Sequence, residues 1–249
     1  MNNNKVSAQI SDQGELIRKI LVRASDSQTA AGYERYFKEV IRFHGLKTPA
    51  LRAVAADLHN SALKHLPFEK RWELAGELFA SEFAEEKSIA IDILRRDLKK
   101  LQISHLKSLA TIIDRHVYDW GTSDSLSGKV IGRMIRADHS LAESLRSWKN
   151  SSCLWRQRSA CVSFVNMARH GQFDDLILDI CKSCIRNPER FVQLGAGWVL
   201  REMTLSDRDR TIAFIKKHYR HFSREGLRYA IEKLPDDQRQ ELLQYRTQC

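Results

Sequence analysis

Residues 190–203 read Arg-Phe-Val-Gln-Leu-Gly-Ala-Gly-Trp-Val-Leu-Arg-Glu-Met and carry two stripes at the spacing of an α-helix. One stripe is apolar, as on a helix face packed against a core, and consists of Val192, Ala196, Val199, Leu200 and Met203. The other stripe lies roughly half a turn away and consists of Arg190, Leu194, Trp198 and Arg201. A Trp at this place can cover a neighbouring helix, because Trp is mostly buried wherever it lies. It can also offer an aromatic surface beside phosphate-seeking charges, as nucleic-acid-binding proteins do.

Helical periodicity recurs along the whole chain, and β-branched alternation is nowhere convincing. The four prolines lie where helices begin, and Thr48-Pro49 predicts an N-cap followed by proline at the first helical position. Gly45 and Gly171 are expected to be the glycines that end two helices. The predicted helices span residues 12–23, 29–43, 49–59, 68–80, 84–99, 103–116, 124–136, 139–149, 153–169, 172–185, 190–203, 206–218, 223–233 and 236–246.

A weak internal repeat runs through these helices. Gln157-Arg158-Ser159-Ala160 and Gln193-Leu194-Gly195-Ala196 agree at two positions and lie 36 residues apart. Ala90, in Lys87-Ser88-Ile89-Ala90, lies 70 residues before Ala160, about two such units. Helix pairs that repeat every 35–45 residues or so are typical of α-solenoids of the HEAT or armadillo type. We therefore predict an all-α fold, a solenoid of HEAT-like helical hairpins that forms a single domain over residues 1–249.

The charge distribution favours a long anionic partner. The chain has 41 Lys and Arg against 31 Asp and Glu, a net charge of +10 at neutral pH. The span from residue 186 to residue 233 alone has 11 Lys and Arg against six Asp and Glu, a net charge of +5. The predicted helix 153–169 repeats the pattern of the opening helix, with an outer stripe of Trp155, Arg158, Val162, Asn166 and Arg169. A charge run is by default a solvated surface, but two helices that present Arg and Trp favour a basic concave groove for DNA or RNA.

Several other protein classes find no support in the sequence. The N-terminus leads into a helical pattern rather than a signal peptide, and the chain has no apolar run long enough to cross a bilayer. Five cysteines without framework spacing fit a reducing cytosol, so we expect a cytoplasmic protein that does not associate with membranes. Cys181-x-x-Cys184 and His218-x-x-His221 raise the idea of a zinc site, but their separation is not that of a zinc finger. Phosphate-loop, dinucleotide, nucleophile-elbow and metalloprotease motifs do not occur.

Asp124 allows two interpretations. The predicted helix 124–136 follows Tyr-Asp-Trp-Gly-Thr-Ser, so Thr122 or Ser123 can serve as its N-cap. An Asp in the first turn is then favoured by the helix dipole, which is an ordinary structural explanation of Asp124. The functional interpretation is that Trp120 and Asp124, four residues apart, share one side of the helix start and set a ring beside a carboxylate.

Five short motifs, in this order along the chain, resemble those of the HEAT-repeat alkylpurine DNA glycosylases, the AlkD-type family. The resemblance extends from about residue 30 to residue 235. The motifs are Arg35-Tyr36-Phe37-Lys38, Gly45-Leu46-Lys47-Thr48-Pro49 with Arg52, Trp120-x-x-x-Asp124, Leu154-Trp155-Arg156-Gln157-Arg158, and Gly197-Trp198-Val199-Leu200-Arg201-Glu202 preceded by a Gln. The chain departs from the family pattern at positions 119 and 121, where the family often has Trp-Trp-Asp and this chain reads Asp119-Trp120-Gly121.

The resemblance implies a role for each matched residue. Asp124 corresponds to the catalytic carboxylate, Trp120 and Trp198 to the two rings that flank the deoxyribose of the lesion, and Arg158 to the arginine that grips the DNA backbone. Further DNA contacts are implied at Tyr36, Lys47, Thr48, Arg52 and Arg201.

The implied activity is hydrolysis of the N-glycosidic bond of N3- or N7-alkylated purines in duplex DNA, a step of base excision repair. The resemblance also implies a monomer of the bacterial type, located in the cytoplasm in association with the nucleoid. It would contact the DNA backbone on an open concave surface and need no metal ion or cofactor. Two alternatives come from other classes of protein. A non-catalytic binder of DNA structures would lack the catalytic residues, so the presence of Trp120, Trp198 and Asp124 argues against it. A protein scaffold would carry apolar or acidic anchors in its groove instead of Arg and Trp.

Overall fold

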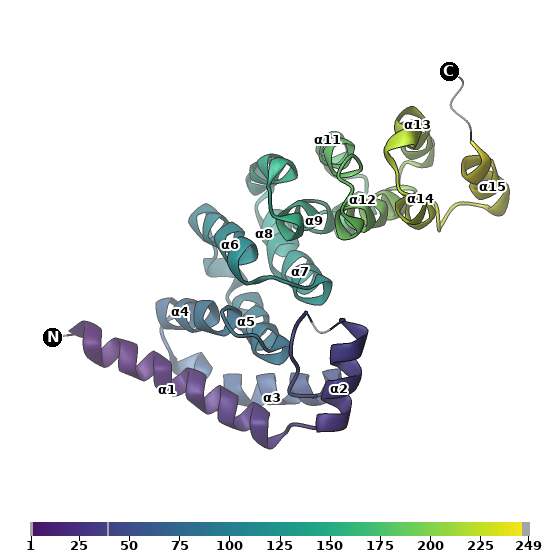
Figure 1. Cartoon of the computed structure of the whole chain (residues 1–249). Helices are drawn as coiled ribbons and strands as arrows, with labels where there is room; N and C mark the ends of the chain where they lie inside the picture. Colours follow the sequence, from purple (N-terminus) through teal and green to yellow (C-terminus); the bar gives the residue numbers. More distant parts are fainter. Residues whose placement is uncertain (1, 39, 246–249) are drawn as a thin grey trace. The chain divides into compact units, whose positions relative to one another are not determined.

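A computed structural model of the chain describes residues 2–38 and 40–245, with side chains from residue 12 onward (Figure 1). Over these residues the protein is all-α, as predicted: helices follow one another without a β-strand. An isolated parallel bridge between Arg42 and Phe83 is the one piece of β-type pairing in the described part of the chain. The chain divides into two compact units, Met1–Ser125 (unit 1) and Leu126–Cys249 (unit 2).

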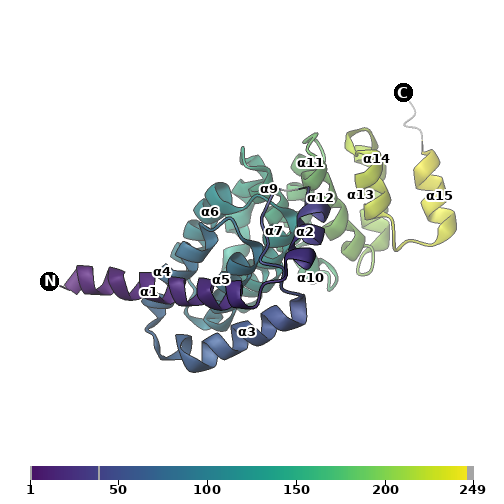
Figure 2. The same ribbon diagram turned by 60° about the horizontal axis from the view of Figure 1, so that its bottom comes forward.

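Unit 1 is built around the helix pair α4 and α5, which share an extensive interface. Its elements are α1 (Asn2–Arg23), α2 (Ser27–Tyr36), α3 (Thr48–Ser61), η1 (Leu63–His65), α4 (Phe68–Phe79), α5 (Ala84–Arg96), η2 (Leu98–Lys100), α6 (Ile103–His116) and the start of α7 (Trp120–Leu126). Helix α1 contacts α3, α4 and α5, and Figure 2 shows it lying alongside α3. Ile17 and Leu21 of α1 are fully buried, so α1 contributes to the core of the unit.

Unit 2 is built around α12, the helix of the opening stretch. Its elements are η3 (Ser127–Ile131), α8 (Gly132–Ala137), η4 (His139–Asn150), α9 (Leu154–Val162), α10 (Val165–Ala168), α11 (Asp174–Cys184), α12 (Arg190–Met203), α13 (Arg208–His218), η5 (Tyr219–His221), α14 (Arg224–Ala230) and α15 (Asp236–Gln244). Helices α9, α12 and α14 lie side by side, with α11 and α13 along one side of this row (Figure 1). All five residues of the predicted apolar stripe of α12 are fully buried, which confirms that part of the sequence analysis.

Of the two helix ends predicted at glycines, one needs correction. The helix predicted over 29–43 ends at Tyr36, and Lys38 takes the left-handed conformation (φ 54°) after it. Gly45 therefore ends no helix: its φ of 92° serves a close approach, since a Cβ there would lie 2.0 Å from the carbonyl oxygen of Asp26. Gly171 does close a helix as predicted, because its N–H and that of Gln172 donate to the carbonyls of Ala168 and Met167.

Smaller differences concern helix type and length. The segment predicted as helix 139–149 is a 3-10 helix, η4, and the helix predicted over 153–169 is interrupted at Ser163 and Phe164 between α9 and α10. Lys47, not Thr48, is the N-cap of α3, and Thr48 is its first residue. Glu39 within the predicted helix 29–43, and residue 246 at the end of the predicted helix 236–246, lie outside the described residues.

The repeat suggested by the sequence has a counterpart in the contacts of two glutamines. In unit 2, Gln157 donates to the carbonyl of Ser151, six residues back, and accepts from the side chain of Asn187, 30 residues ahead. Gln193 donates to the carbonyl of Asn187, six residues back, and accepts from the N–H of Ser223, 30 residues ahead. Each glutamine thus joins the loop before its own helix to the loop before the next repeat.

Candidate functional site

The nine predicted site residues fall in both units. Unit 1 contains Tyr36, Lys47, Thr48, Arg52, Trp120 and Asp124, and unit 2 contains Arg158, Trp198 and Arg201.

The start of α7 shows which residue caps this helix. Asp119 is buried, and its Oδ1 accepts a hydrogen bond of 2.8 Å from the N–H of Thr122, the contact of an N-cap. The helix therefore begins at Trp120, and Thr122 and Ser123 are buried within its first turns. The prediction that either of these two caps the helix is wrong, because Asp119 offers a carboxylate one turn earlier. Asp124 then lies beyond the first turn, where neither capping nor the helix dipole explains it.

Trp120 lies in an aromatic cluster formed with Tyr36, Phe37 and Phe43. The Trp120 ring stacks on Phe37 with centroids 4.9 Å apart and planes within 8°, and Tyr36 meets its edge at 6.0 Å. Phe37 packs in turn on Phe43 at 5.2 Å. The departure from the family pattern at Gly121 fits this packing, since a Cβ there would lie 3.2 Å from the Phe37 ring. The sequence analysis assigned no role to Phe37, although it lies within a matched motif.

The structure thus brings together three of the six predicted residues of unit 1. Tyr36 contacts Trp120, and Trp120 shares α7 with Asp124; both α7 side chains are half-buried and so reach the surface. Tyr36 is 69% exposed, so much of its ring is accessible to a partner.

Lys47, Thr48 and Arg52 form a second group at the start of α3. All three are exposed. The backbone N–H groups at a helix N-terminus favour anions, and Lys47 and Arg52 add two cationic side chains there. The arrangement suits a phosphate.

A buried carboxylate holds the loop that leads into this second group. Glu85 Oε1 accepts hydrogen bonds from the N–H groups of Gly45 and Leu46 at 2.9 and 3.1 Å, and Oε2 accepts one from His44 at 3.0 Å. The neighbouring Glu86 binds Arg18 at 3.1 Å and the His44 ring at 3.4 Å. The sequence analysis missed both carboxylates, since a Glu pair in the first turn of a helix ordinarily faces solvent.

Lys87 follows this pair and is fully buried. Its Nζ donates to the carbonyl of His116 and lies 4.3 Å from the centroid of the Tyr118 ring. Burial lowers the pKa of Lys87 to about 8, while the negative charge of Asp119 acts in the opposite direction. The internal repeat could have pointed to Lys87 as a buried, bridging residue, because alignment of the repeats places Lys87 at the position of Gln157.

In unit 2, Arg158 is not on an outer stripe. It is 5% exposed and Val162 is 2% exposed, so the prediction that these two residues face outward is wrong. Arg158 Nη1 donates to the carbonyl of Phe191 at 2.7 Å, and a Cβ on Gly195 would lie 3.1 Å from Arg158 Cγ. The missing side chain at Gly195 makes room for the stem of Arg158 between α9 and α12. Its assignment as the DNA-gripping arginine stays a prediction.

Trp198 and Arg201 differ in their surroundings. Trp198 is half-buried, so its ring is not sealed within the core of the unit. Arg201 Nη1 contacts Glu232 at 2.7 Å, its Nη2 contacts Glu202 at 3.0 Å, and its guanidinium lies 4.7 Å from the centroid of the Tyr229 ring. Arg201 is therefore already paired with two carboxylates, one of which, Glu202, also binds Lys233, and a phosphate would have to compete with these contacts.

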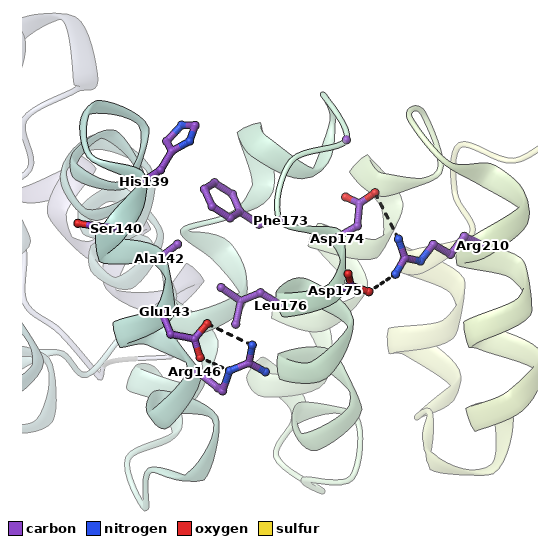
Figure 3. Close-up of a pocket in the computed structure, with 11 residues that line it drawn as sticks. His139, Ser140, Ala142, Glu143, Arg146, Phe173, Asp174, Asp175, Leu176 and Arg210 are labelled. Carbon is purple, nitrogen blue, oxygen red and sulfur yellow. Dashed lines mark hydrogen bonds and ion pairs between the residues drawn. The ribbon is translucent and has the colours of Figure 1, made fainter.

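A pocket of about 560 Å³ in unit 2 contains none of the nine predicted residues (Figure 3). Its two arginines are paired with carboxylates: Arg146 with Glu143, and Arg210 with Asp174 and Asp175. These pairs leave the pocket close to electrically balanced, which does not suit a polyanion.

The cysteine and histidine pairs of the zinc idea do not form a metal centre. Cys181 and Cys184 lie in the core with Cys161, and all three are free thiols. The rings of His218 and His221 lie 6.4 Å apart. Across the described residues, no group of three or more His, Cys, Asp or Glu is arranged to hold a metal ion.

No helix within residues 2–38 and 40–245 is both long enough and apolar enough to cross a membrane.

Comparisons with known proteins agree with the all-α fold and with the family that the sequence motifs resemble. A search of curated proteins gave no significant match. Among solved structures, the chain is similar to a predicted DNA alkylation repair enzyme from Enterococcus faecalis, with a TM-score of 0.77 and 17% identity over 85% of this chain and 97% of the other. At that identity the likeness shows the fold. The family model of the DNA alkylation repair enzymes matches residues 17–234. Since the match covers most of the sequence, the chain belongs to the DNA alkylation repair enzyme family.

Proposed function

We propose that the protein is a DNA glycosylase that hydrolyses the N-glycosidic bond of N3- and N7-alkylated purines in duplex DNA. Membership of the family supports a role in alkylation repair. The finer proposal is carried by one observation: α7 sets Trp120 and Asp124 four residues apart, and Asp119 already caps the helix. Asp119, and not Asp124, is therefore the residue that caps α7.

The chemistry that we propose needs little more than this pair. An N3- or N7-alkylated purine is positively charged, so it can leave without protonation by a general acid. What remains is to stabilise the oxocarbenium-like sugar and to place a water molecule, and a single carboxylate can do both. We assign these tasks to Asp124. Trp120 would offer its electron-rich face to the developing positive charge, an interaction of about 0.5–2 kcal/mol, while its stacking on Phe37 holds the ring in place.

We propose that the remaining predicted residues contact the DNA strand. In unit 1, Tyr36 offers an exposed ring, and Lys47, Thr48 and Arg52 suit a backbone phosphate. The roles of Arg158, Trp198 and Arg201 of unit 2 are carried over from the resemblance. The single HEAT-like domain, the monomeric state, the cytoplasmic location and the independence from metals and cofactors also stay predictions.

The decisive experiment is Asp124→Asn, assayed by single-turnover release of base from duplex DNA that contains N7-methylguanine. Asn keeps the size of the side chain but removes its charge, so we expect the excision rate to fall by about two to three orders of magnitude. DNA affinity should be equal or higher, because a negative charge is lost near phosphates. Asp57→Asn is the matched control: Asp57 is exposed on α3, and its substitution makes the same change in net charge.

The outcomes separate the proposal from its alternatives. A wild-type rate in Asp124→Asn would show that Asp124 is not the catalytic carboxylate. DNA binding by the wild-type protein without any excision would favour the non-catalytic binder of DNA structures. The absence of binding even at low salt would favour a protein scaffold.

A further inference from the structure

The first turn of α5 buries three ionisable residues in succession. Glu85 and Glu86 are each 2% exposed and Lys87 is 0% exposed. Charged side chains are rarely buried unless they are paired or hydrogen-bonded, because their desolvation is costly. Glu85 binds the loop before α3, Glu86 binds Arg18 of α1 and the His44 ring of the same loop, and Lys87 binds the loop before α7. The turn is therefore a point of attachment for these three segments.

Glu85 attaches the loop before α3. Its two carboxylate oxygens accept three backbone N–H groups, from His44, Gly45 and Leu46. An amide cannot reproduce this arrangement, because one of the two oxygens would become an NH₂ group facing an N–H donor. The next residue of the loop is Lys47, so the carboxylate sets the position of the residues that we assign to a phosphate.

Lys87 attaches the loop before α7. Its Nζ donates to the carbonyl of His116 and packs on the Tyr118 ring. The negative charge of Asp119 attracts it. Asp119 Oδ1 caps α7, whereas its Oδ2 is buried without a hydrogen-bond partner in the described part of the chain. A positive charge nearby compensates a carboxylate held in this way.

The repeat explains why a lysine at this place is unusual. Gln157 and Gln193 in unit 2 reach 30 residues ahead with a neutral amide. Lys87 reaches 29 residues ahead, to His116, with an ammonium group. The neutral amide of a glutamine suffices to join two loops. The ammonium group of Lys87 occurs where the loop ahead contains the buried Asp119 and leads into α7, the helix of Trp120 and Asp124.

We propose that the first turn of α5 positions two parts of the DNA site separately: Lys87 positions α7, with Trp120 and Asp124, through His116 and Asp119, and Glu85 positions the loop that leads to Lys47 and Thr48. The proposal rests on the proposed function for its effect on catalysis. The two attachments themselves are properties of unit 1 that can be measured without DNA.

The test compares Lys87→Gln and Glu85→Gln in the full chain, with Lys107→Gln as the control for charge, since Lys107 is exposed on α6. Amide hydrogen exchange should become faster in residues 117–126 for Lys87→Gln and in residues 42–48 for Glu85→Gln, each without change in the other segment. Lys87→Gln should lower the single-turnover excision rate at saturating DNA by about tenfold, the effect of one charge-assisted contact. Glu85→Gln should weaken DNA binding by about the same factor. Lys107→Gln should match the wild type in exchange and excision.

A double variant tests the route through Asp119. If Lys87 acts through that carboxylate, Lys87→Gln should cost little further excision rate in an Asp119→Asn background, because Asn keeps the cap without the charge. Additive losses would overturn this route. Unchanged exchange of residues 117–126 in Lys87→Gln would overturn the positioning role, as would global unfolding of that variant, which would make Lys87 a general core residue. If the wild-type protein excises no base, the proposed function fails, and hydrogen exchange alone decides the positioning role.

Discussion

Gln193 provides the sharpest test of how the signature of α12 works. The residue is 3% exposed, and its amide has four backbone partners. Nε2 shares its two hydrogens among the carbonyls of Ile185, Asn187 and His221, and Oε1 accepts from the N–H of Ser223. Gln193→Met keeps the length and volume of the side chain but removes all of these bonds. We therefore expect a pure loss of hydrogen bonding, without a cavity.

The size of the effect follows from the burial of the partners. The bond to Ile185 is buried and the other three are part-buried, so water can replace some of them. With about 1–3 kcal/mol for each buried group left unsatisfied, we expect Gln193→Met to lower the free energy of unfolding by about 3–4 kcal/mol. Gln157→Met should cost about 1–2 kcal/mol, because Gln157 is half-buried and makes two such bonds.

Urea unfolding followed by circular dichroism measures both variants, with the wild type at the same pH and temperature. Gln172→Met is the control, since Gln172 is exposed in the loop before α11, and it should stay within about 0.5 kcal/mol of the wild type. A loss below about 1 kcal/mol for Gln193→Met, or one no larger than that of Gln157→Met, would refute the view that Gln193 holds the loops of unit 2 together.

Three further results are expected. Gly197→Ala should lower the free energy of unfolding by about 1–3 kcal/mol, because its Cβ would lie 2.8 Å from the carbonyl oxygen of Gly226; Gly76→Ala on α4 meets nothing within 4 Å and should stabilise by up to about 1 kcal/mol in the same urea titration. Duplex affinity, measured by fluorescence anisotropy, should fall with salt at a slope of about −0.9 per phosphate contacted, and an affinity that is flat in salt would contradict the DNA groove. Since burial lowers the pKa of Lys87 to about 8, below its ordinary 10.5, the unfolded state binds more protons between these values; stability should therefore rise with pH over that window by up to about 3 kcal/mol relative to Lys87→Gln in urea titrations at each pH.

The periodic part of the fold could be read from the sequence. The apolar stripe of α12 is buried at all five positions. Apolar residues that recur every 3.6 residues form one face of an α-helix, and that face packs against a core. Where the sequence analysis failed, a contact distant in sequence decided the structure. Gly45 looked like a helix-ending glycine, but it owes its conformation to the backbone of Asp26.

The same limit applies to the candidate site. Trp120 and Asp124 could be paired from their spacing alone, because both lie on one helix. Phe37, which stacks on Trp120 across more than 80 residues of sequence, could not be assigned in this way. Arg158 was placed on an outer stripe by a regular helix pattern, but α9 packs on Gly195 of α12, and this tertiary contact buries the arginine.

The three thiols in the core of unit 2 have a consequence for the chemical durability of the protein. Hydrogen bonds among these thiols, together with burial, raise the pKa of Cys161 and of Cys184 well above the usual range. Only the thiolate form of cysteine is a strong nucleophile, so these sulfur atoms react slowly with methylating electrophiles. Under the proposed function, the reagents that create the substrate also reach the enzyme that removes it. Protonated thiols at Cys161 and Cys184 would keep the packing around them through such an exposure, and among the described thiols the half-buried Cys153 is the one open to attack.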